Sequence, residues 1–149
     1  MAQDFLSFID RIKAERPDEF VSVSDEIDPA HTITATVVKT EQETKKRPVF
    51  VFENVKGTDF KVMTNLHASR PRLGMAMGVG PREMQKKFLA AMENPIPPKQ
   101  INTGPCKDVI IKGADVDMLA LPQIVQHGDD GGPYITAAIS FAKDPETGI

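Results

Sequence analysis

Twelve prolines divide this 149-residue chain into short stretches, and four of them fall within residues 94–105. Because proline lacks a backbone N–H and has a fixed φ angle, it interrupts helix interiors and central strands. The helices and strands between the prolines must therefore be short. The dense group at 94–105 predicts a semi-rigid linker or crossover between two parts of the chain.

The charge distribution changes at the same place. Residues 1–93 carry 14 basic and 14 acidic side chains, whereas residues 94–149 carry 4 basic and 7 acidic ones, so the last third accounts for the whole net charge of −3. The linker and the charge break together predict an N-terminal α/β domain at residues 1–100 and the start of a second, β-rich domain at residues 101–149. The expected fold class is therefore α/β, with the segregation of elements seen in α+β proteins.

The residues before the linker predict short helices mixed with strands. We expect helices at 4–16, 31–43, 70–79 and 81–94, and strands at 20–24, 48–54 and 60–66. Asp4 and Ser69 are the predicted caps of the first and third helices, and Asp28-Pro29 is the predicted opening of the second. The second helix is ambiguous because its β-branched residues favour a strand, and we favour the helix. The last helix, opened by Pro81, is expected to bury a stripe of Met84, Phe88, Leu89 and Met92.

The residues after the linker have the composition of strands and turns. Residues 106–113 are expected to form a strand, and residues 134–143 have the strongest strand pattern in the chain. The sequence DPETGI at 144–149 has turn chemistry.

Residue spacing alone identifies no metal site and no catalytic triad. His31, His67 and His127 have no partner at a known ligand spacing, and Cys106 has no basic surroundings that would activate a thiol. Residues 127–130, HGDD, are the one cluster of metal-capable side chains, and we interpret them as a solvated loop.

Two further patterns are interpreted as structural. Gly74, Gly78 and Gly80 fit a helix-ending turn better than a phosphate-binding loop, although the helix that opens after them could hold an anion at its N-terminus. The basic residues 45–47 are interpreted as a solvated loop rather than a patch for phosphate or nucleic acid.

The composition also argues against two kinds of partner. The net charge is acidic and aromatic residues make up only 6% of the chain, so no nucleic-acid role is expected. No apolar run approaches the about 20 residues that span a bilayer, and the N-terminus lacks the pattern of a signal peptide. The sequence therefore predicts a cytoplasmic protein without a membrane partner.

Several short motifs occur in an order that resembles the UbiD family of decarboxylases. Residues 115–122, DVDMLALP, are similar to the family pattern vDl..LP, and His127 lies in the histidine-containing loop that follows. Residues 130–136, DGGPYIT, are similar to DgG.Yit, and residues 144–148, DPETG, are similar to dP.tG. Further matches upstream are Asp28-Pro29, the strand Val49–Phe52 with Glu53-Asn54, Asn65-Leu66 with Ser69-Arg70, and Pro81. The resemblance covers essentially the whole chain.

This resemblance implies a lyase that reversibly decarboxylates aromatic or α,β-unsaturated acids with prenylated FMN (prFMN). It implies that residues 101–149 are the first strands of a split β-barrel that binds this flavin, with manganese and, optionally, potassium. Such enzymes are oligomers in which the cofactor carries the hard chemistry and the protein positions the reactants. Of the residues present, Thr136 and Ala137 are expected to lie near the flavin.

The same resemblance places the family's other functional residues outside this sequence. The Asn-x-x-x-x-Arg motif, the remaining His and Glu metal ligands and the acid/base glutamates are expected after Ile149. No catalytic residue and no metal ligand is therefore assigned here, and the 149-residue chain alone is expected to be inactive.

Two functions of different class follow. In the first, the chain is the N-terminal part of a UbiD-type decarboxylase, as a truncated product or as one piece of a split enzyme that works as a homo-oligomer or with a complementing chain. In the alternative, it is a non-catalytic assembly or interaction subunit, whose strand at 134–143 would pair with a partner chain. Neither hypothesis identifies the carboxylic acid that would be the substrate.

Overall fold

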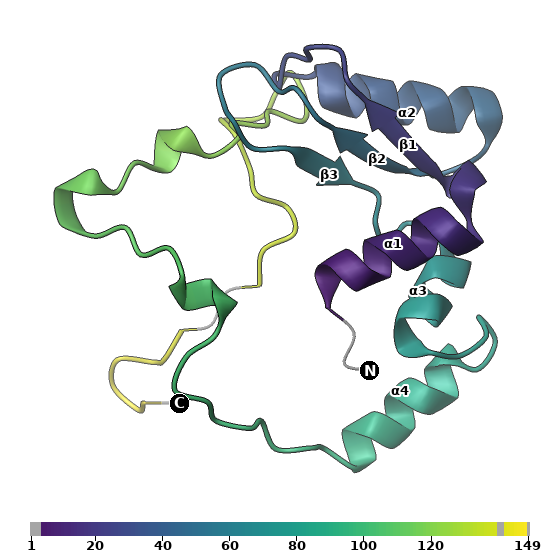
Figure 1. The fold of residues 1–149 in the computed structure, drawn as a ribbon, viewed down its shortest axis with the longest axis vertical. Coiled ribbons are helices and arrows are strands. Elements are labelled where there is room, and N and C mark those ends of the chain that lie inside the picture. Colours follow the sequence, from purple (N-terminus) through teal and green to yellow (C-terminus); the bar gives the residue numbers. More distant parts are fainter. Residues whose placement is uncertain (1–3, 140–141, 149) are drawn as a thin grey trace.

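The architecture is a small three-stranded sheet with helices on both faces and a long arm of irregular chain (Figure 1). The structure is a computed structural model, and it describes residues 4–139 and 142–148. The helices are α1 (Phe5–Glu15), α2 (Thr32–Thr44), α3 (Arg70–Met77) and α4 (Met84–Glu93). The strands are β1 (Phe20–Val23), β2 (Val49–Phe52) and β3 (Val62–Thr64), and the short 3-10 helices are η1 (Pro17–Glu19), η2 (Pro105–Lys107), η3 (Gly113–Asp115) and η4 (Met118–Ala120). The mixture of helix and sheet confirms the predicted α/β fold class.

The sheet has the order β1-β2-β3, with β1 parallel and β3 antiparallel to the central strand β2. A parallel pair needs a crossover connection, and α2 provides it between β1 and β2. Because side chains alternate along a strand, Phe50 and Phe52 face α2 while Val49 faces α1 and α3. The buried residues thus form two clusters, one on each face of the sheet. Every buried hydrophobic residue in the described ranges lies between Phe8 and Met75, so the core belongs to this first half of the chain.

Helix α1 begins and ends where the sequence predicts. Asp4 is its N-cap: the carboxylate accepts a hydrogen bond from Ser7 N at 2.8 Å, and Ser7 Oγ accepts one from Asp4 N at 3.1 Å. This reciprocal pair satisfies two of the backbone N–H groups that every helix start leaves free. The buried face consists of Phe8, Ile9 and Ile12.

Helix α2 confirms the choice of helix over strand, but the predicted opening at Asp28-Pro29 is wrong. The helix starts at Thr32, after His31 with a φ of 66°. The Asp28 carboxylate instead accepts a hydrogen bond from Ala30 N at 2.8 Å, which closes a turn before the helix. The hydroxyls of Thr36, Thr40 and Thr44 on this helix donate to the carbonyls four residues earlier, so these three polar groups are paired within the helix.

The last two helices differ from expectation in their starts and in burial. Ser69 occupies the N-cap position of α3, but its side chain makes no capping hydrogen bond. Helix α4 begins at Met84 rather than at Pro81. Its predicted buried stripe is wrong, since Phe88, Leu89 and Met92 are each more than half exposed. The reason is that α3, which contacts α4, leaves most of this apolar face uncovered, and only Met84 of the stripe is half-buried.

The two strands predicted after the linker are also wrong within the described residues. Residues 106–113 contain parts of η2 and η3, and residues 134–139 form no strand; the remainder of that second prediction at 140–141 lies outside the described residues. A β-strand exists only where a neighbour accepts and donates its hydrogen bonds. In the described part of the chain these segments have no such neighbour, and Val109, Ile110 and Ile111 are more than 60% exposed.

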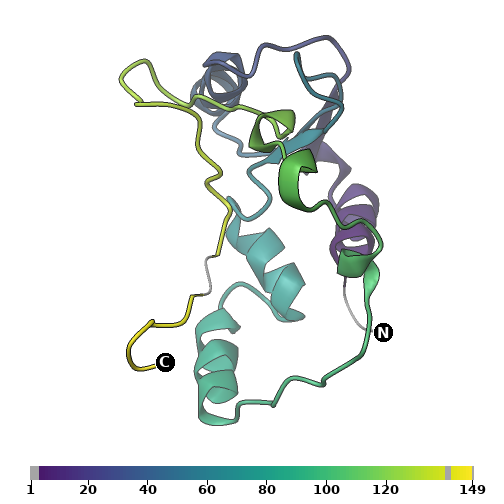
Figure 2. The ribbon, with the colours of Figure 1, turned by 90° about the vertical axis from the view of Figure 1, so that its left-hand side faces the viewer.

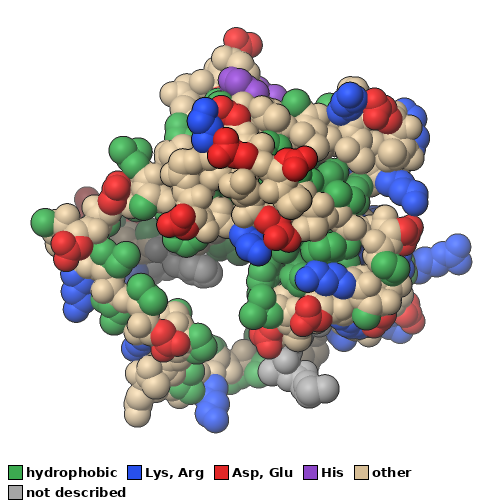
Figure 3. Space-filling model, turned by 45° about the horizontal axis from the view of Figure 1, so that its top comes forward, with side chains coloured by type: hydrophobic (Ala, Val, Ile, Leu, Met, Phe, Trp, Pro, Cys, Tyr) green, Lys and Arg blue, Asp and Glu red, His purple; other side chains and the backbone are tan. Residues whose placement is uncertain are grey.

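The irregular residues after α4 form an arm that leaves the sheet and returns to it. Figure 2 shows the linker running out from the end of α4 as extended chain before the short turns lead back. Figure 3 shows an open space between this arm and the rest of the molecule. The return is fixed by His31 N, which donates to Val125 O at 2.8 Å, and by the Thr58 hydroxyl, which donates to Ala120 O at 3.0 Å.

None of the helices in residues 4–139 and 142–148 has the length and apolar character that crossing a bilayer requires.

The turn between α3 and α4 depends on Gly74. A Cβ atom at this buried position would lie 2.6 Å from Val79 O, and Val79 N donates to Gly74 O at 2.9 Å. Since the backbone cannot yield easily there, Gly74→Ala is expected to lower the free energy of unfolding by about 1–3 kcal/mol. Urea unfolding followed by circular dichroism measures this change. Gly128→Ala is the matched control, because no atom lies within 4 Å of its added Cβ; equal losses in both variants would contradict the prediction.

Candidate functional site

The returning arm encloses a cavity against the edge of the sheet. It has a volume of about 400 Å³, within the range of small-molecule sites. Its walls come from four segments: Ile33, Thr34 and Val37 of α2, Val62–Thr64 of β3, the turn at 65–68, and Ile124, Gln126, Thr136 and Ala137 of the arm. Residues separated by about a hundred positions in the sequence thus share one site.

The two residues predicted to lie near a flavin are both in this cavity wall. Thr136 and Ala137 face the space from the arm, opposite α2 and β3. The arm is held there because the Thr34 hydroxyl donates to Gln126 Oε1 at 2.9 Å and Tyr134 N donates to Ile124 O at 3.0 Å. The structure gives Thr136 and Ala137 a shared site, and their contact with a flavin stays a prediction.

Thr64, on the wall opposite the arm, has a polar group that the sequence analysis did not identify. Thr64 Oγ1 is buried and has no hydrogen-bond partner among the described residues. An unpaired buried hydroxyl costs about 1–3 kcal/mol, and because this oxygen has almost no accessible surface, it does not reach a ligand in the cavity as the wall stands. Local sequence pattern could not identify it, because Thr64 simply ends a strand.

The turn after β3 supplies the rest of the polar wall. Asn65 has a φ of 60°, and Asn65 O accepts a hydrogen bond from Ala68 N at 3.0 Å. The ring of His67 stacks on Phe8, with the centroids 6.2 Å apart. The family-like pair Asn65-Leu66 was the one sequence signal that pointed to this turn.

The other sequence candidates lie elsewhere. In the loop 127–130, the Asp130 carboxylate accepts hydrogen bonds from Gln126 N at 3.1 Å and His127 N at 2.9 Å, so it stabilises the turn. Cys106 is exposed. Within the described ranges no group of three or more His, Cys, Asp or Glu residues comes together as a metal site would require.

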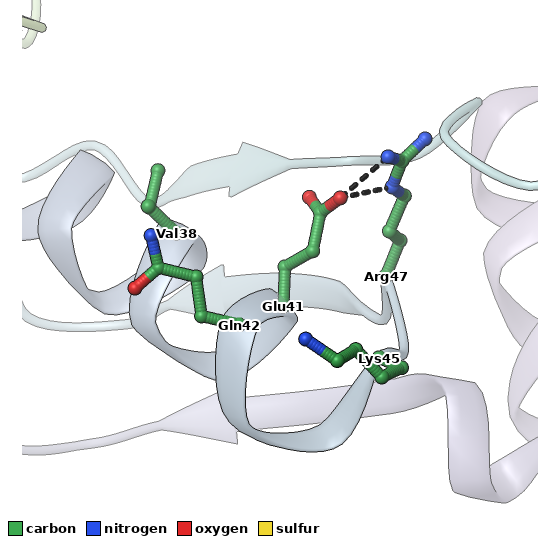
Figure 4. Close-up of a pocket in the computed structure, with 5 residues that line it drawn as sticks. All are labelled: Val38, Glu41, Gln42, Lys45 and Arg47. Atoms are coloured by element: carbon green, nitrogen blue, oxygen red, sulfur yellow. Dashed lines mark hydrogen bonds and ion pairs between the residues drawn. The ribbon is translucent and has the colours of Figure 1, made fainter.

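A second hollow lies at the end of α2 and has more polar walls (Figure 4). Its volume is about 560 Å³. Arg47 Nε donates to Glu41 Oε1 at 2.6 Å, and Arg47 Nη2 lies 2.5 Å from the same oxygen as an ion pair. Because the acid and the arginine satisfy each other, we interpret this hollow as part of the solvated surface.

Behind the 65–68 turn lies a buried charge. Arg72 has no exposed surface, and its guanidinium pairs with Glu19. Partial burial acts to raise the pKa of Glu19, but hydrogen bonds and charges from Arg16 and Arg72 hold that pKa below its ordinary value. Glu19 is therefore ionised at neutral pH and compensates the buried cation.

Comparison with known families assigns both parts of the chain. Residues 13–92 match the N-terminal domain of 3-octaprenyl-4-hydroxybenzoate carboxy-lyase, and residues 99–149 match the Rift-related domain of the same enzyme. The chain therefore belongs to the UbiD family, as the order of its motifs predicts.

Individual relatives agree with this assignment. The UbiD-class enzyme HmfF from Pelotomaculum thermopropionicum, in a dimeric evolved form that holds prFMN, superimposes with a TM-score of 0.84 and 33% identity over 97% of this chain and 33% of HmfF. An uncharacterised protein of Rhodospirillum rubrum is 31% identical over 98% of this chain and 31% of its own length. Anhydromevalonate phosphate decarboxylase from Methanothermobacter thermautotrophicus is 32% identical over 69% of this chain and 23% of its own length. The chain thus spans a third or less of the length of these relatives.

Proposed function

We propose that the chain is the N-terminal part of a UbiD-type decarboxylase, a carboxy-lyase that uses prFMN to remove or add the carboxyl group of an aromatic or α,β-unsaturated acid. The observation that carries this proposal is the similarity of nearly the whole chain to HmfF, a prFMN-containing enzyme. In the proposal, residues 1–100 and 101–149 belong to two domains. The catalytic groups, a divalent metal such as manganese, and potassium are supplied by other parts of a cytoplasmic oligomer or by a complementing chain.

The cavity residues fit one portion of a flavin. The walls combine apolar side chains with the neutral polar side chains of Thr34, Asn65 and Gln126. This lining suits an uncharged planar ring with hydrogen-bonding edges. It contains no lysine or arginine, so it does not fit the phosphate of the cofactor, which requires cations from outside this set.

The division of labour follows from that lining. When bound, the flavin supplies the electron-accepting ring that carbon–carbon bond cleavage requires. The residues of this chain shape the cavity: the apolar side chains limit the access of water to the ring, and Thr136 and Ala137 limit the space on the arm side. No proton transfer is assigned to these residues.

A chimera tests the proposal. Residues 1–149 replace the matching third of HmfF, and both prFMN absorbance and turnover of the HmfF substrate are measured. We expect the chimera to bind the flavin and to decarboxylate, whereas the isolated chain does not decarboxylate. A chimera that folds but has neither flavin nor activity would contradict the proposal.

A variant in the chimera examines the cavity itself. Thr136→Tyr overfills the space at a cost of about 1–3 kcal/mol, which corresponds to roughly 5–150-fold weaker flavin binding. Thr103→Tyr, at an exposed position in the linker, is the matched control and is expected to leave flavin affinity unchanged. Equal affinities for the two variants would count against a flavin contact at Thr136.

The exposed apolar residues of the arm favour a second candidate, a non-catalytic subunit that pairs with a partner chain. Val109, Ile110 and Ile111 form no strand in this structure, and they present an apolar surface to solvent. Under this alternative, the chain co-purifies in fixed ratio with a partner that has no flavin site. A partner that contributes the metal and acid/base residues supports the decarboxylase instead.

A further inference from the structure

Arg72 is the one buried charged side chain in the described residues, and the cavity walls do not include it. Arginine is rarely fully buried unless all of its donors are paired. Arg72 lies on α3, next to the 65–68 turn that lines the cavity, so the partners of its guanidinium bear on the structure of that turn.

The guanidinium of Arg72 bonds to three backbone carbonyls and one carboxylate. Nε donates to Leu66 O at 3.1 Å, and Nη2 donates to Asn65 O at 2.9 Å and to Arg47 O at 2.7 Å. Nη1 donates to Glu19. Two of the three carbonyls belong to the 65–68 turn, so Arg72 holds the backbone of that turn.

The turn needs such support. Asn65 has a φ of 60°, in the left-handed region, and this conformation persists only where surrounding contacts fix it. Arg72 Nη2 and Ala68 N both donate to Asn65 O, which fixes the direction of that peptide unit. Thr64, Asn65 and Leu66 all line the cavity, so the direction of this peptide bears on the shape of the cavity wall.

Only arginine provides this set of bonds. Its planar fork presents five N–H donors at fixed angles, whereas a lysine ammonium is a single point on a flexible stem. A lysine could reach one or two of the acceptors but could not bridge Glu19, Arg47 O and the turn at once.

We propose that Arg72 is a positioning residue that holds the 65–68 turn, and with it Asn65 and His67, in the geometry that the cavity presents to the planar ring of a bound flavin. The inference rests on the proposed function for the identity of the ligand. The hydrogen bonds between Arg72 and the turn do not depend on a ligand. They act through the backbone of the turn, without contact between Arg72 and the ligand.

The test compares Arg72→Lys with Arg70→Lys, a matched change at an exposed position on the same helix. Two-dimensional NMR of the 149-residue chain follows the amide signals of residues 64–68 and the ring signals of His67, which report its stacking on Phe8. Arg72→Lys is expected to shift these signals while the signals of α1 and β1 stay in place. In the HmfF chimera it is expected to weaken flavin binding by about tenfold, the lower end of what loss of a supporting partner costs. Arg70→Lys is expected to change neither.

The outcomes distinguish a role of Arg72 in positioning the turn from a contribution to the stability of the fold alone. If Arg72→Lys lowers only the urea midpoint, with the turn signals and flavin affinity unchanged, the proposal is overturned. If the lysine variant does not fold, the wild-type chain supplies the measurement: the Nε–H of Arg72, which donates to Leu66 O, is expected to exchange slowly with solvent, and rapid exchange overturns the proposal equally. If the wild-type chimera binds no flavin, the proposed function fails, while the NMR comparison still decides whether Arg72 holds the turn.

Discussion

Phe52→Ala is expected to lower the free energy of unfolding by about 3–5 kcal/mol, one of the two largest losses from a single change in this chain. Phe52 lies on the central strand β2 and has no exposed surface. Its ring stacks on Phe50 at a centroid distance of 5.7 Å, and it packs in the cluster that includes Ile33 of α2. Truncation therefore leaves a cavity at the junction of the sheet and the crossover helix, where neither element can move inward without losing other contacts. Urea unfolding followed by circular dichroism gives the value.

Phe60→Ala is the matched control for that change. Phe60 is 53% exposed, so its loss removes little buried surface and is expected to cost less than about 1 kcal/mol. A loss at Phe52 no larger than at Phe60 would show that the core is not organised around β2. The cavity described above depends on the same layer, because Ile33 belongs both to this cluster and to the cavity wall.

The elements that the sequence predicted correctly are those whose signals are local. The apolar face of residues 4–16, with Asp4 before it and Pro17 after it, suffices to define α1. The two apolar stretches that contain β2 and β3 flank a turn, so two strands around that turn were predicted. The second helix was harder, because its β-branched residues favour strands and its start depends on the positive φ of His31.

The failures have a common physical cause, which is that burial and strand pairing need a partner. Residues 106–113 have strand composition, but in the described part of the chain no neighbouring strand completes their hydrogen bonds. The stripe on α4 has helical spacing, yet Phe88 and Leu89 stay more than half exposed. A pattern indicates which face would be buried and carries no information on whether a covering surface is present.

The candidate site was predictable only in part. Thr136 and Ala137 came from the resemblance to the UbiD family and not from local pattern. Thr64 and Gln126 are ordinary residues in the sequence, and they become relevant because the arm returns to the edge of the sheet. Arg72 gave no signal at all, since a buried arginine cannot be distinguished from an exposed one by its neighbours in the chain.

Arg72→Met is expected to lower the free energy of unfolding by about 3–5 kcal/mol, a cost typical of breaking a buried ion pair. Methionine of similar length can occupy the space, so the loss does not arise from a cavity. It arises because the carbonyls of Arg47 and Leu66 lose the guanidinium donor, Asn65 O keeps only Ala68 N, and an unpaired, partly buried acceptor is costly. Replacement of a whole ion pair by apolar groups can be neutral, but main-chain carbonyls cannot be replaced. Arg70→Met, at an exposed position on α3, is the control and is expected to change stability by no more than about 0.5 kcal/mol.

A double-mutant cycle of Arg72→Met and Glu19→Gln measures how much of the lost stability comes from the ion pair between the two residues. Glu19→Gln leaves the guanidinium buried beside a neutral amide, so its loss is expected to be smaller than that of Arg72→Met. Once Arg72 is methionine, Glu19 faces only Arg16 and solvent, and Glu19→Gln should then cost almost nothing. The two changes are therefore expected to be non-additive by about 0.5–3 kcal/mol, the range found for residues in one network. Additive losses would mean that Arg72 is held by the carbonyls alone and that Glu19 is a surface charge, because a carboxylate that neutralises a buried cation cannot be independent of it.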